Sequence, residues 1–227
     1  MKQIDTITEL LRHVPLCHAL DQARLAQVAD ACELLKFARN EMIFDRGAPV
    51  NGLYYMVSGC VKLYAMSKDG VEKVVHLATP GEAFGEAAMF LDAPAPVATQ
   101  AVQDSVVLVL PKSVLYKLIE ADPQVAHQML AGMSMRMHRL IQDIKAVGLK
   151  SATERVIGYL LQLCCDQTEV QNIVLPAKKS TIASLLNLTP ETLSRILTKL
   201  EQQGLIFVNA TEIRIPDCDR LRGDTLA

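Results

Sequence analysis

Apolar residues recur at helical spacing near the C-terminal end of the chain. They follow the i, i+3, i+4, i+7 pattern of a buried stripe, and polar residues repeat that spacing on the opposite face. Thr189 can cap this helix, and Pro190 suits its first position because an N–H there would be unpaired. The apolar stripe is Leu193, Ile196, Leu197 and Leu200, and the polar face is Glu191, Ser194, Arg195 and Thr198.

A shorter helical pattern lies just upstream, over residues 180–186. The tight Asn187-Leu188 connection joins it to the first helix, which is typical of a helix-turn-helix with residues 191–200 as the recognition helix. Gly204 then predicts a helix end, and the runs 205–208 and 212–215 around Asn209-Ala210 predict a hairpin that forms a wing.

The longest helical pattern follows Asp122-Pro123, and its apolar positions are spaced four, three, four, three, four and three residues apart. That heptad rhythm is typical of a two-helix coiled coil, so we expect a homodimer interface. The alternative is that the stripe packs on a β domain of its own chain. The seam positions are Ala126, Leu130, Met133, Met137, Leu140, Ile144 and Val147.

Between residues 34 and 110 the pattern changes to short β-type runs separated by Gly, Pro and Asp. Many short strands at regular spacing predict a sandwich or a barrel-like roll. Short helices are expected before the roll, over 4–11 and 21–29, and after it, over 113–120. The predicted strands are 42–44, 53–57, 61–66, 73–78, 97–101 and 106–110.

The predicted fold class is α+β, with three parts. Residues 1–121 form N-terminal helices and a β-roll sensor domain, 122–149 a dimerisation helix, and 150–227 a winged helix-turn-helix domain. The Gly148-Leu149-Lys150 break is a candidate hinge, and Ser151 to Glu154 has the form of a capping box that opens a helix through Cys165.

Composition narrows the functional classes. A 227-residue chain with 50% apolar residues can bury a core, and a net charge of -2 argues against indiscriminate coating of nucleic acid. Positive charge is local: Lys178, Lys179, Arg195 and Lys199 oppose only Glu191 between residues 178 and 200. The six cysteines include no CxxC pair, and no signal peptide or membrane span is evident, so we expect a reduced cytoplasmic protein without a membrane partner.

Three segments resemble the Crp/Fnr family of bacterial transcription regulators: residues 54–62, 84–90 and 191–195. The order of roll, long helix and winged helix agrees with that family over nearly the whole chain. The resemblance implies a roll like that of cyclic-nucleotide-binding domains, and a homodimer that binds double-stranded DNA and recruits RNA polymerase. The runs 59–62, 86–90 and 97–99 are most similar to the Dnr branch, which responds to nitric oxide.

Side-chain chemistry on the recognition helix fits base reading. Arg195 can donate two hydrogen bonds to guanine, and Glu191 can accept one from the cytosine amine. The resemblance implies the same roles, and Ser194 is similar to the Fnr type, which reads inverted repeats of TTGAT-like half-sites. Pro190 stands where cyclic AMP receptors carry arginine. The remaining candidate DNA contacts are Thr192, Thr181, Lys178, Lys179 and Lys199.

The sensor site departs from that of the cyclic AMP receptors. Gly85 and Glu86 remain, but Pro96-Val97 stands where those proteins bind phosphate with Arg-Ser, and Leu140-Ile141 replaces the adenine-binding Thr-Ser pair. We therefore do not expect cyclic nucleotide binding, although a cyclic nucleotide or another small molecule stays the alternative effector. The candidate effector pocket is lined by six residues: Gly85, Glu86, Pro96, Val97, Leu140 and Ile141. An enzyme is not expected, because no nucleophile–base arrangement is evident.

The Dnr-like resemblance implies haem between the roll and the long helix. His13 and His18 are the candidate haem ligands, with Cys17, His76, His127 and His138 as weaker alternatives. An iron–sulfur cluster is not expected, because Cys17 is the only cysteine near the N-terminus and the others are scattered.

Overall fold

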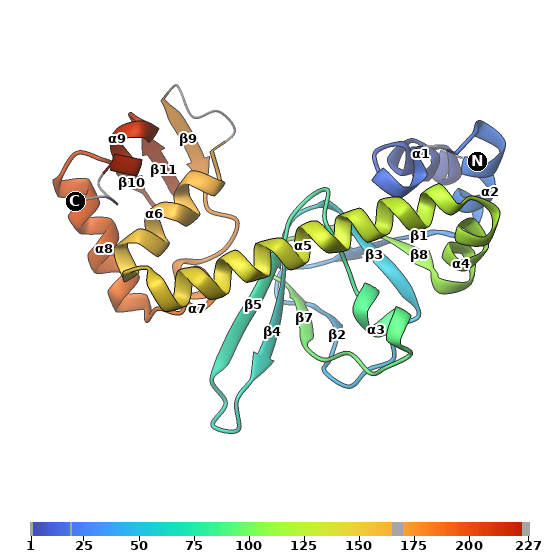
Figure 1. The fold of residues 1–227 in the computed structure, drawn as a ribbon, viewed down its shortest axis with the longest axis horizontal. Helices are drawn as coiled ribbons and strands as arrows, with labels where there is room; N and C mark the ends of the chain where they lie inside the picture. Colours follow the sequence, from blue (N-terminus) through green and yellow to red (C-terminus); the bar gives the residue numbers. More distant parts are fainter. Residues whose placement is uncertain (1, 19, 165–169, 224–227) are drawn as a thin grey trace. The chain divides into compact units, whose positions relative to one another are not determined.

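The computed structural model describes residues 2–18, 20–164 and 170–223 (Figure 1). The chain divides into two compact units, 1–137 and 138–227, and the long helix α5 contributes to both. The three-part division predicted from the sequence follows the ends of α5 instead.

The first unit contains helices at both ends and strands between them. Its elements are α1 (Lys2–Arg12), η1 (Pro15–Cys17), α2 (Gln22–Ala31), β1 (Glu33–Phe37), β2 (Met42–Phe44), β3 (Gly52–Ser58), β4 (Val61–Met66), β5 (Glu72–Ala78), β6 (Ala83–Phe84), α3 (Glu86–Leu91), β7 (Ala98–Ala101), β8 (Ser105–Pro111), α4 (Lys112–Ala121) and the first part of α5 (Pro123–Leu149).

The strands form two antiparallel sheets, in the orders β1-β8-β3-β6 and β2-β7-β4-β5. Both sheets contribute to one apolar cluster, in which Met56 and Val107 come from the first and Val61 and Ala101 from the second. This cluster lies between the two sheets and forms the interior of a sandwich. The predicted α+β class with an N-terminal β-roll is confirmed.

The turn between β3 and β4 depends on glycine. Gly59 has a φ of +87°, and a Cβ there would lie 2.4 Å from the carbonyl oxygen of Asp104. The next residue, Cys60, donates its backbone N–H to Ser105 Oγ at 3.2 Å, and Ser105 Oγ also lies 3.3 Å from the Cys60 carbonyl. This close approach fixes the start of β4 against the start of β8.

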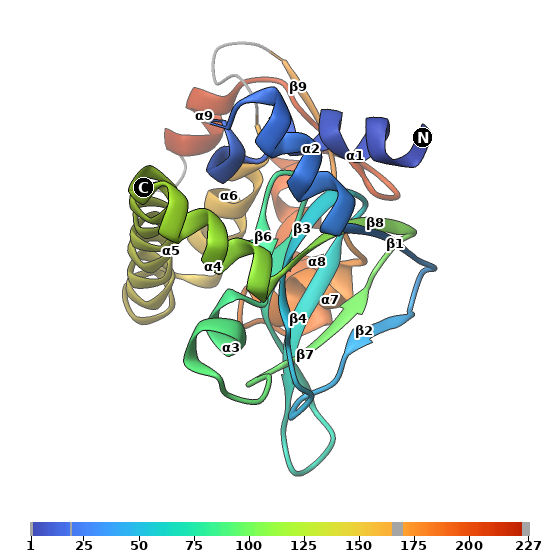
Figure 2. The ribbon, with the colours of Figure 1, turned by 90° about the vertical axis from the view of Figure 1, so that its right-hand side faces the viewer.

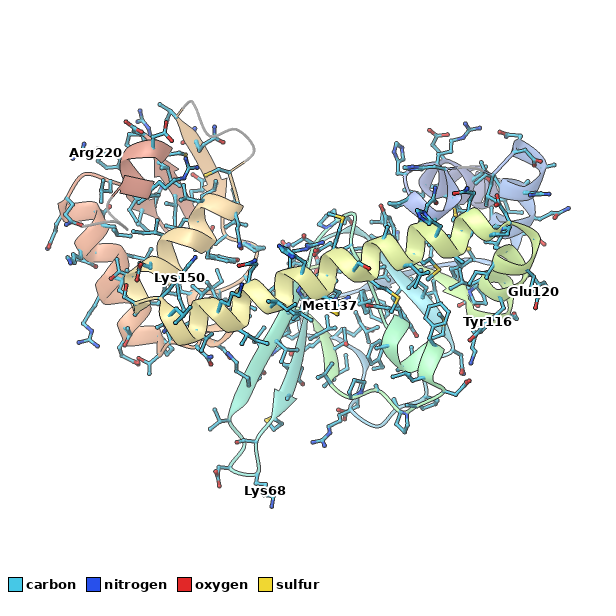
Figure 3. All side chains as sticks on the ribbon, in the orientation of Figure 1. Lys68, Tyr116, Glu120, Met137, Lys150 and Arg220 are labelled. Atoms are coloured by element: carbon cyan, nitrogen blue, oxygen red, sulfur yellow. The ribbon has the colours of Figure 1, made fainter. Side chains whose placement is uncertain are left out.

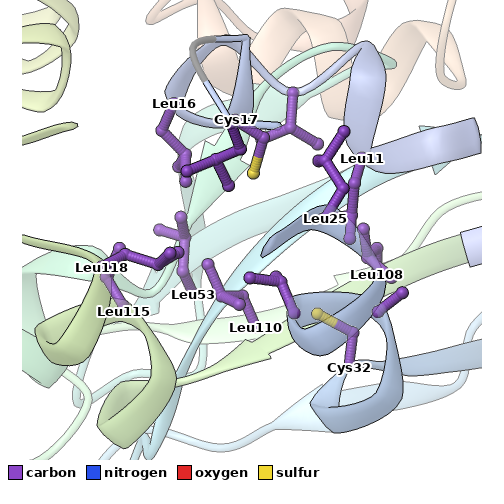
Figure 4. Packing of buried hydrophobic residues seen from close by; sticks show 14 of the residues in the cluster. Leu11, Leu16, Cys17, Leu25, Cys32, Leu53, Leu108, Leu110, Leu115 and Leu118 are labelled. Carbon is purple, nitrogen blue, oxygen red and sulfur yellow. The ribbon is translucent and has the colours of Figure 1, made fainter. Parts of the chain in front are cut away.

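A second core lies between the sheet of β3 and β8 and the N-terminal helices (Figure 2). Leu11, Cys17 and Leu25 from the N-terminal segment pack with Leu108 from β8 and Leu115 from α4 (Figure 4). The N-terminal helices therefore belong to the roll, as the sequence pattern predicted.

The second unit contains the remaining part of α5, further helices and a small sheet. Its other elements are α6 (Ala152–Gln162), β9 (Gln171–Val174), α7 (Lys179–Leu185), α8 (Pro190–Gln202), β10 (Phe207–Asn209), β11 (Glu212–Ile215) and α9 (Cys218–Gly223). The sheet is antiparallel in the order β10-β11-β9. Leu160, Ile182, Leu193 and Ile213 from α6, α7, α8 and β11 line one apolar cavity.

The predicted capping box is present at the start of α6. Ser151 Oγ accepts the N–H of Glu154 at 3.2 Å, and Glu154 Oε2 accepts the N–H of Ser151 at 2.6 Å. At its other end α6 stops at Gln162, short of the predicted end at Cys165, which lies outside the described residues.

The prediction also placed the first wing strand two residues too early. β10 begins at Phe207 because Leu205 and Ile206, although apolar, are buried as the chain leaves α8. Elements β1, β6, α3, β9 and α9 were not predicted, since each is short or lacks a clear period.

Candidate functional site

The turn between α7 and α8 is held by an arginine from a third helix. Arg155 on α6 donates from Nε to the Leu186 carbonyl at 3.0 Å and from Nη2 to the Asn187 carbonyl at 3.5 Å. Asn187 has a φ of +58°, a left-handed conformation that asparagine tolerates better than most residues. Arg155 thus satisfies carbonyl groups at the end of α7 and sets the entry to α8.

Helix α8 is capped as the sequence predicted. Thr189 Oγ1 accepts the backbone N–H of Thr192 at 3.2 Å, and Pro190 occupies the first turn. The four stripe residues Leu193, Ile196, Leu197 and Leu200 are buried. Because that stripe is anchored in the domain, the opposite face of α8 must point to solvent.

The solvent face of α8 presents the predicted base-reading residues. Glu191, Ser194 and Arg195 are exposed, whereas Thr192 is half-buried. The hydroxyl of Thr192 lies 3.1 Å from that of Thr189 and accepts a hydrogen bond from Arg195 Nη2 at 3.3 Å. The structure therefore places Thr192 beside the Arg195 guanidinium, where it can orient that group as well as meet DNA.

The carboxylate of Glu191 is held in its charged form. Its own backbone N–H and the Thr189 side chain hydrogen-bond to it, and the Arg195 charge contributes, so the pKa of Glu191 lies below its ordinary value. A charged carboxylate is a hydrogen-bond acceptor only. At this position it can accept from an amine such as cytosine N4 and not from a carbonyl oxygen.

The predicted phosphate contacts lie at the start of α7 and on the later part of α8. Lys178 and Lys199 are exposed, and Lys179 and Thr181 are half-buried. Lys178 stands at the N-cap position of α7 without making a side-chain cap. These residues bring positive charge to the helix pair that carries Arg195, and their role as phosphate contacts stays a prediction.

Gly85 and Glu86 lie together at the start of α3. Gly85 has a φ of +88°, and a Cβ there would lie 3.0 Å from a ring carbon of Tyr54. The Tyr54 ring stacks on that of Phe84, with centroids 5.3 Å apart. The predicted pocket residue Gly85 is thus wedged beside aromatic rings, which leaves little room for a larger residue.

Glu86 is engaged by an arginine that the sequence pattern did not single out. Arg136 Nη1 on α5 lies 2.6 Å from Glu86 Oε1 and also donates to the Ala83 carbonyl at 3.2 Å. Within the described part of the chain, the second carboxylate oxygen of Glu86 is buried without a hydrogen-bond partner. This ion pair ties α3 to α5 inside the first unit.

The other predicted pocket residues offer no cation. Pro96 is exposed, and Val97 packs against the apolar cluster that contains Phe84. Leu140 and Ile141 are exposed and belong to the second unit. The cluster beside Val97 thus includes Phe84, the residue that precedes Gly85. The pocket formed by all six residues stays a prediction.

The candidate haem ligands His13 and His18 flank a buried turn. Both side chains are exposed, whereas Cys17 between them is 1% exposed. Burial raises the pKa of Cys17 to about 12, so it holds its proton and is a poor iron ligand. Across the described residues, no three His, Cys, Asp or Glu side chains are grouped to hold a metal ion.

The seam positions of α5 form an exposed apolar stripe in the single chain. Ala126 is half-buried, and the rest are exposed to very different extents, from 44% at Met133 to 73% at Ile144. The exposed members are Leu130, Met133, Met137, Leu140, Ile144 and Val147. Met137, near the middle of α5, is labelled in Figure 3.

Within the parts that the structure describes, no helix combines the length and apolarity needed to span a bilayer.

The fold and the exposed face of α8 define a class of protein: a DNA-binding regulator that joins a sensory β-roll to a winged helix. Family models match both parts, a cyclic nucleotide-binding domain over residues 34–122 and a Crp-like helix-turn-helix domain over 154–223. The chain is 32% identical over 213 residues to the nitrogen fixation regulation protein FixK of Azorhizobium caulinodans, covering 89% of this chain and 83% of the relative.

Solved structures agree with this comparison. FixK2 from Bradyrhizobium japonicum is similar with a TM-score of 0.76 and 27% identity, over 85% of this chain and 96% of that one. DNR from Pseudomonas aeruginosa is similar with a TM-score of 0.51 and 30% identity, over 95% and 98%. The chain belongs to the Crp/Fnr family, whose members in these comparisons are transcription regulators and not enzymes.

Sequence reasoning missed Arg155 and Arg136. Each acts on residues 30 or more positions away, so no local spacing could have revealed the pairing. The only available signal was an arginine within a helical pattern, which is usually a solvated residue.

Proposed function

We propose that this regulator binds DNA as a homodimer and reads an inverted repeat of TTGAT-like half-sites. The observation that carries the proposal is the division of α8 into a buried apolar stripe and an exposed face with Glu191, Ser194 and Arg195. A helix anchored in this way can enter the major groove, whose base edges distinguish all four base pairs.

Each exposed group then has a distinct task. Arg195 donates to O6 and N7 of a guanine, and Glu191 accepts from the N4 amine of a cytosine. The two side chains lie one turn of α8 apart on the same face. Ser194, between them, donates to or accepts from a neighbouring base. Thr192 orients the Arg195 guanidinium through its hydroxyl, and the lysines of α7 and α8 contact phosphates.

The proposed dimer forms through α5. Its stripe leaves apolar side chains such as Ile144 exposed in the single chain, and burying them against a second copy removes that surface from water. The heptad spacing fits a partner helix. Two recognition helices must lie about 34 Å apart to read successive turns of one DNA face, which a symmetric dimer provides.

The proposed signal is nitric oxide bound to haem. Support comes from the exposed imidazoles of His13 and His18 beside an apolar segment, and from the similarity to DNR. These residues fit an axial ligand set, since neutral imidazole is a common iron ligand. Bound haem would supply an iron atom whose ligation changes with the gas. His13 is also tied to the roll, because Tyr55 donates its hydroxyl to the His13 carbonyl at 3.1 Å.

The optical spectrum of the protein with equimolar haemin, with and without nitric oxide, tests this signal. We expect a Soret band that shifts with the gas and that weakens in His13→Ala or His18→Ala. A band that weakens in His138→Ala and not in these two variants would assign the iron to that alternative ligand. A spectrum that stays that of free haemin would contradict the haem proposal and leave the DNA proposal intact.

A cyclic nucleotide is the alternative effector, favoured by the match to cyclic nucleotide-binding domains and by Gly85 and Glu86. A cyclic phosphate needs a cation, and Pro96-Val97 supplies none. Calorimetric titration with cyclic AMP and cyclic GMP decides between the two effectors. On DNA, the dimer is proposed to recruit RNA polymerase, which a pull-down of the enzyme on promoter DNA would test.

A further inference from the structure

Two cysteines of the second unit bring their sulfur atoms into contact. Sγ of Cys218, the first residue of α9, lies 3.7 Å from Sγ of Cys164, which follows the end of α6. The residues are 54 positions apart in the sequence. Only the fold of the winged domain creates this dithiol.

The separation is small enough for a bond to form. A disulfide needs about 2.05 Å between sulfurs, so the two atoms must approach by about 1.7 Å. Both residues lie at helix ends, Cys164 just after the α6 cap Leu163 and Cys218 at the start of a short helix. Helix ends adjust at lower cost than helix interiors, because their last turns fray.

The two sulfurs differ in access to solvent. Cys218 is 2% exposed, whereas Cys164 is half-buried. An oxidant in solution therefore meets Cys164 first, and Cys218 is positioned behind it to resolve the product. Burial raises the pKa values of Cys17, Cys32 and Cys60 in the first unit to about 12, which suppresses their thiolate forms.

We propose that Cys164 and Cys218 form a reversible intramolecular disulfide when a peroxide oxidises the protein. One oxygen of hydrogen peroxide transfers to the Cys164 sulfur, which gives a sulfenic acid and one water. The Cys218 sulfur then attacks the Cys164 sulfur, and the S–S bond forms as the sulfenic oxygen leaves with the Cys218 proton as a second water. A dithiol reductant reverses the reaction by exchange.

The disulfide would act on the recognition helix through α9. Arg220, which is labelled on α9 in Figure 3, donates from Nη2 to the carbonyl of Gln203 at 3.3 Å, and Gln203 caps the C-terminal end of α8. Moving Cys218 toward Cys164 shifts α9, and with it the hydrogen bond from Arg220 to the Gln203 carbonyl. The expected consequence, which rests on the proposed DNA function, is a DNA affinity about tenfold lower in the oxidised protein.

Mass spectrometry of the full-length chain tests the bond directly. One equivalent of hydrogen peroxide should remove two hydrogen atoms from the intact chain, and a non-reducing digest should join the peptides that contain residues 164 and 218. Cys164→Ser and Cys218→Ser should lose this cross-link, whereas Cys165→Ser and Cys60→Ser should keep it, and dithiothreitol should reverse it. Oxygen added to sulfur without a cross-link, a cross-link through Cys165, or one between chains overturns the proposal.

DNA titration tests the effect of the disulfide on DNA affinity separately from the formation of the disulfide. Oxidised wild type should bind the half-site duplex about tenfold more weakly than reduced protein, while Cys164→Ser shows no response to peroxide. A cross-link formed with unchanged affinity overturns the coupling to α8. Reduced protein that fails to bind any duplex contradicts the proposed DNA function. In that case the mass-spectrometric cross-link still shows whether Cys164 and Cys218 form a disulfide.

Discussion

Arg136 Nη1 on α5 lies 2.6 Å from Oε1 of Glu86 at the start of α3, and the two side chains are 31% and 16% exposed. The pair joins the proposed dimer helix to the segment that carries the candidate effector pocket. A charge this poorly solvated depends on its partner, because removing one member of a buried pair leaves the other without compensation.

Arg136→Met should therefore lower the free energy of unfolding of the first unit by about 1–3 kcal/mol. Glu86→Gln should cost less, and the double variant should recover part of the loss because no unpaired charge remains. Urea titration of all three proteins measures this. Equal midpoints for wild type and Arg136→Met would show that the pair contributes nothing to stability.

Glu82 should make the roll sensitive to acid. Burial alone would raise its pKa, but hydrogen bonds from His76 and from the Thr79 backbone and hydroxyl outweigh burial and lower it from 4.5 to about 2. Because the folded pKa lies below the unfolded one, the stabilisation is present above about pH 4.5 and is lost as pH falls toward 2.

The loss expected from Glu82 is about 2 kcal/mol, after allowance for its partial exposure. Glu82→Gln should flatten the decline in unfolding free energy between pH 4.5 and pH 2, whereas Glu120→Gln, at an exposed site on α4, should not. A Glu82→Gln profile that parallels wild type through this range would refute the assignment.

The exposed stripe of α5 predicts the effect of a charge at the dimer seam. Ile144→Glu should weaken dimerisation by about 100-fold or more, because two carboxylates would be desolvated in the interface. Analytical ultracentrifugation should detect monomers where wild type is dimeric. Gln142→Glu, at an exposed position of α5 outside the seam, serves as the control. A dimeric Ile144→Glu protein would place the interface elsewhere.

Loss of the α8 cap should destabilise the winged domain. Thr189→Ala removes the acceptor for the Thr192 N–H and should cost about 1 kcal/mol of unfolding free energy. Thr198→Ala, exposed on the same helix, should cost much less. Thermal unfolding of the two variants gives the comparison, and equal melting temperatures would contradict the role of the cap.

The period of apolar residues was sufficient to predict the long helix, the helix-turn-helix and most strands of the roll. For example, β4 matches its predicted span at residues 61–66, and α8 has the cap and buried stripe that were expected. Strand β1 was missed because its Leu34-Leu35 pair does not alternate in polarity, and β9 because its four residues are too few to show a period.

The site was predictable where chemistry and spacing coincide on one element. Glu191, Ser194 and Arg195 share one face of one helix, so their exposure followed from the stripe behind them. Interactions between distant elements, such as Arg155 on Leu186 or Cys164 on Cys218, depend on tertiary packing and left no local pattern.

The most direct test of the central claim is fluorescence anisotropy with two duplexes, one carrying the inverted repeat of TTGAT half-sites and one with these bases scrambled. Arg195→Ala should lose most of the preference for the repeat, about 1–3 kcal/mol for each half-site, while remaining dimeric. Lys199→Ala should weaken binding to both duplexes alike and reduce the salt slope by about one for each phosphate that the lysine no longer neutralises. An Arg195→Ala protein that keeps the wild-type preference would contradict the account.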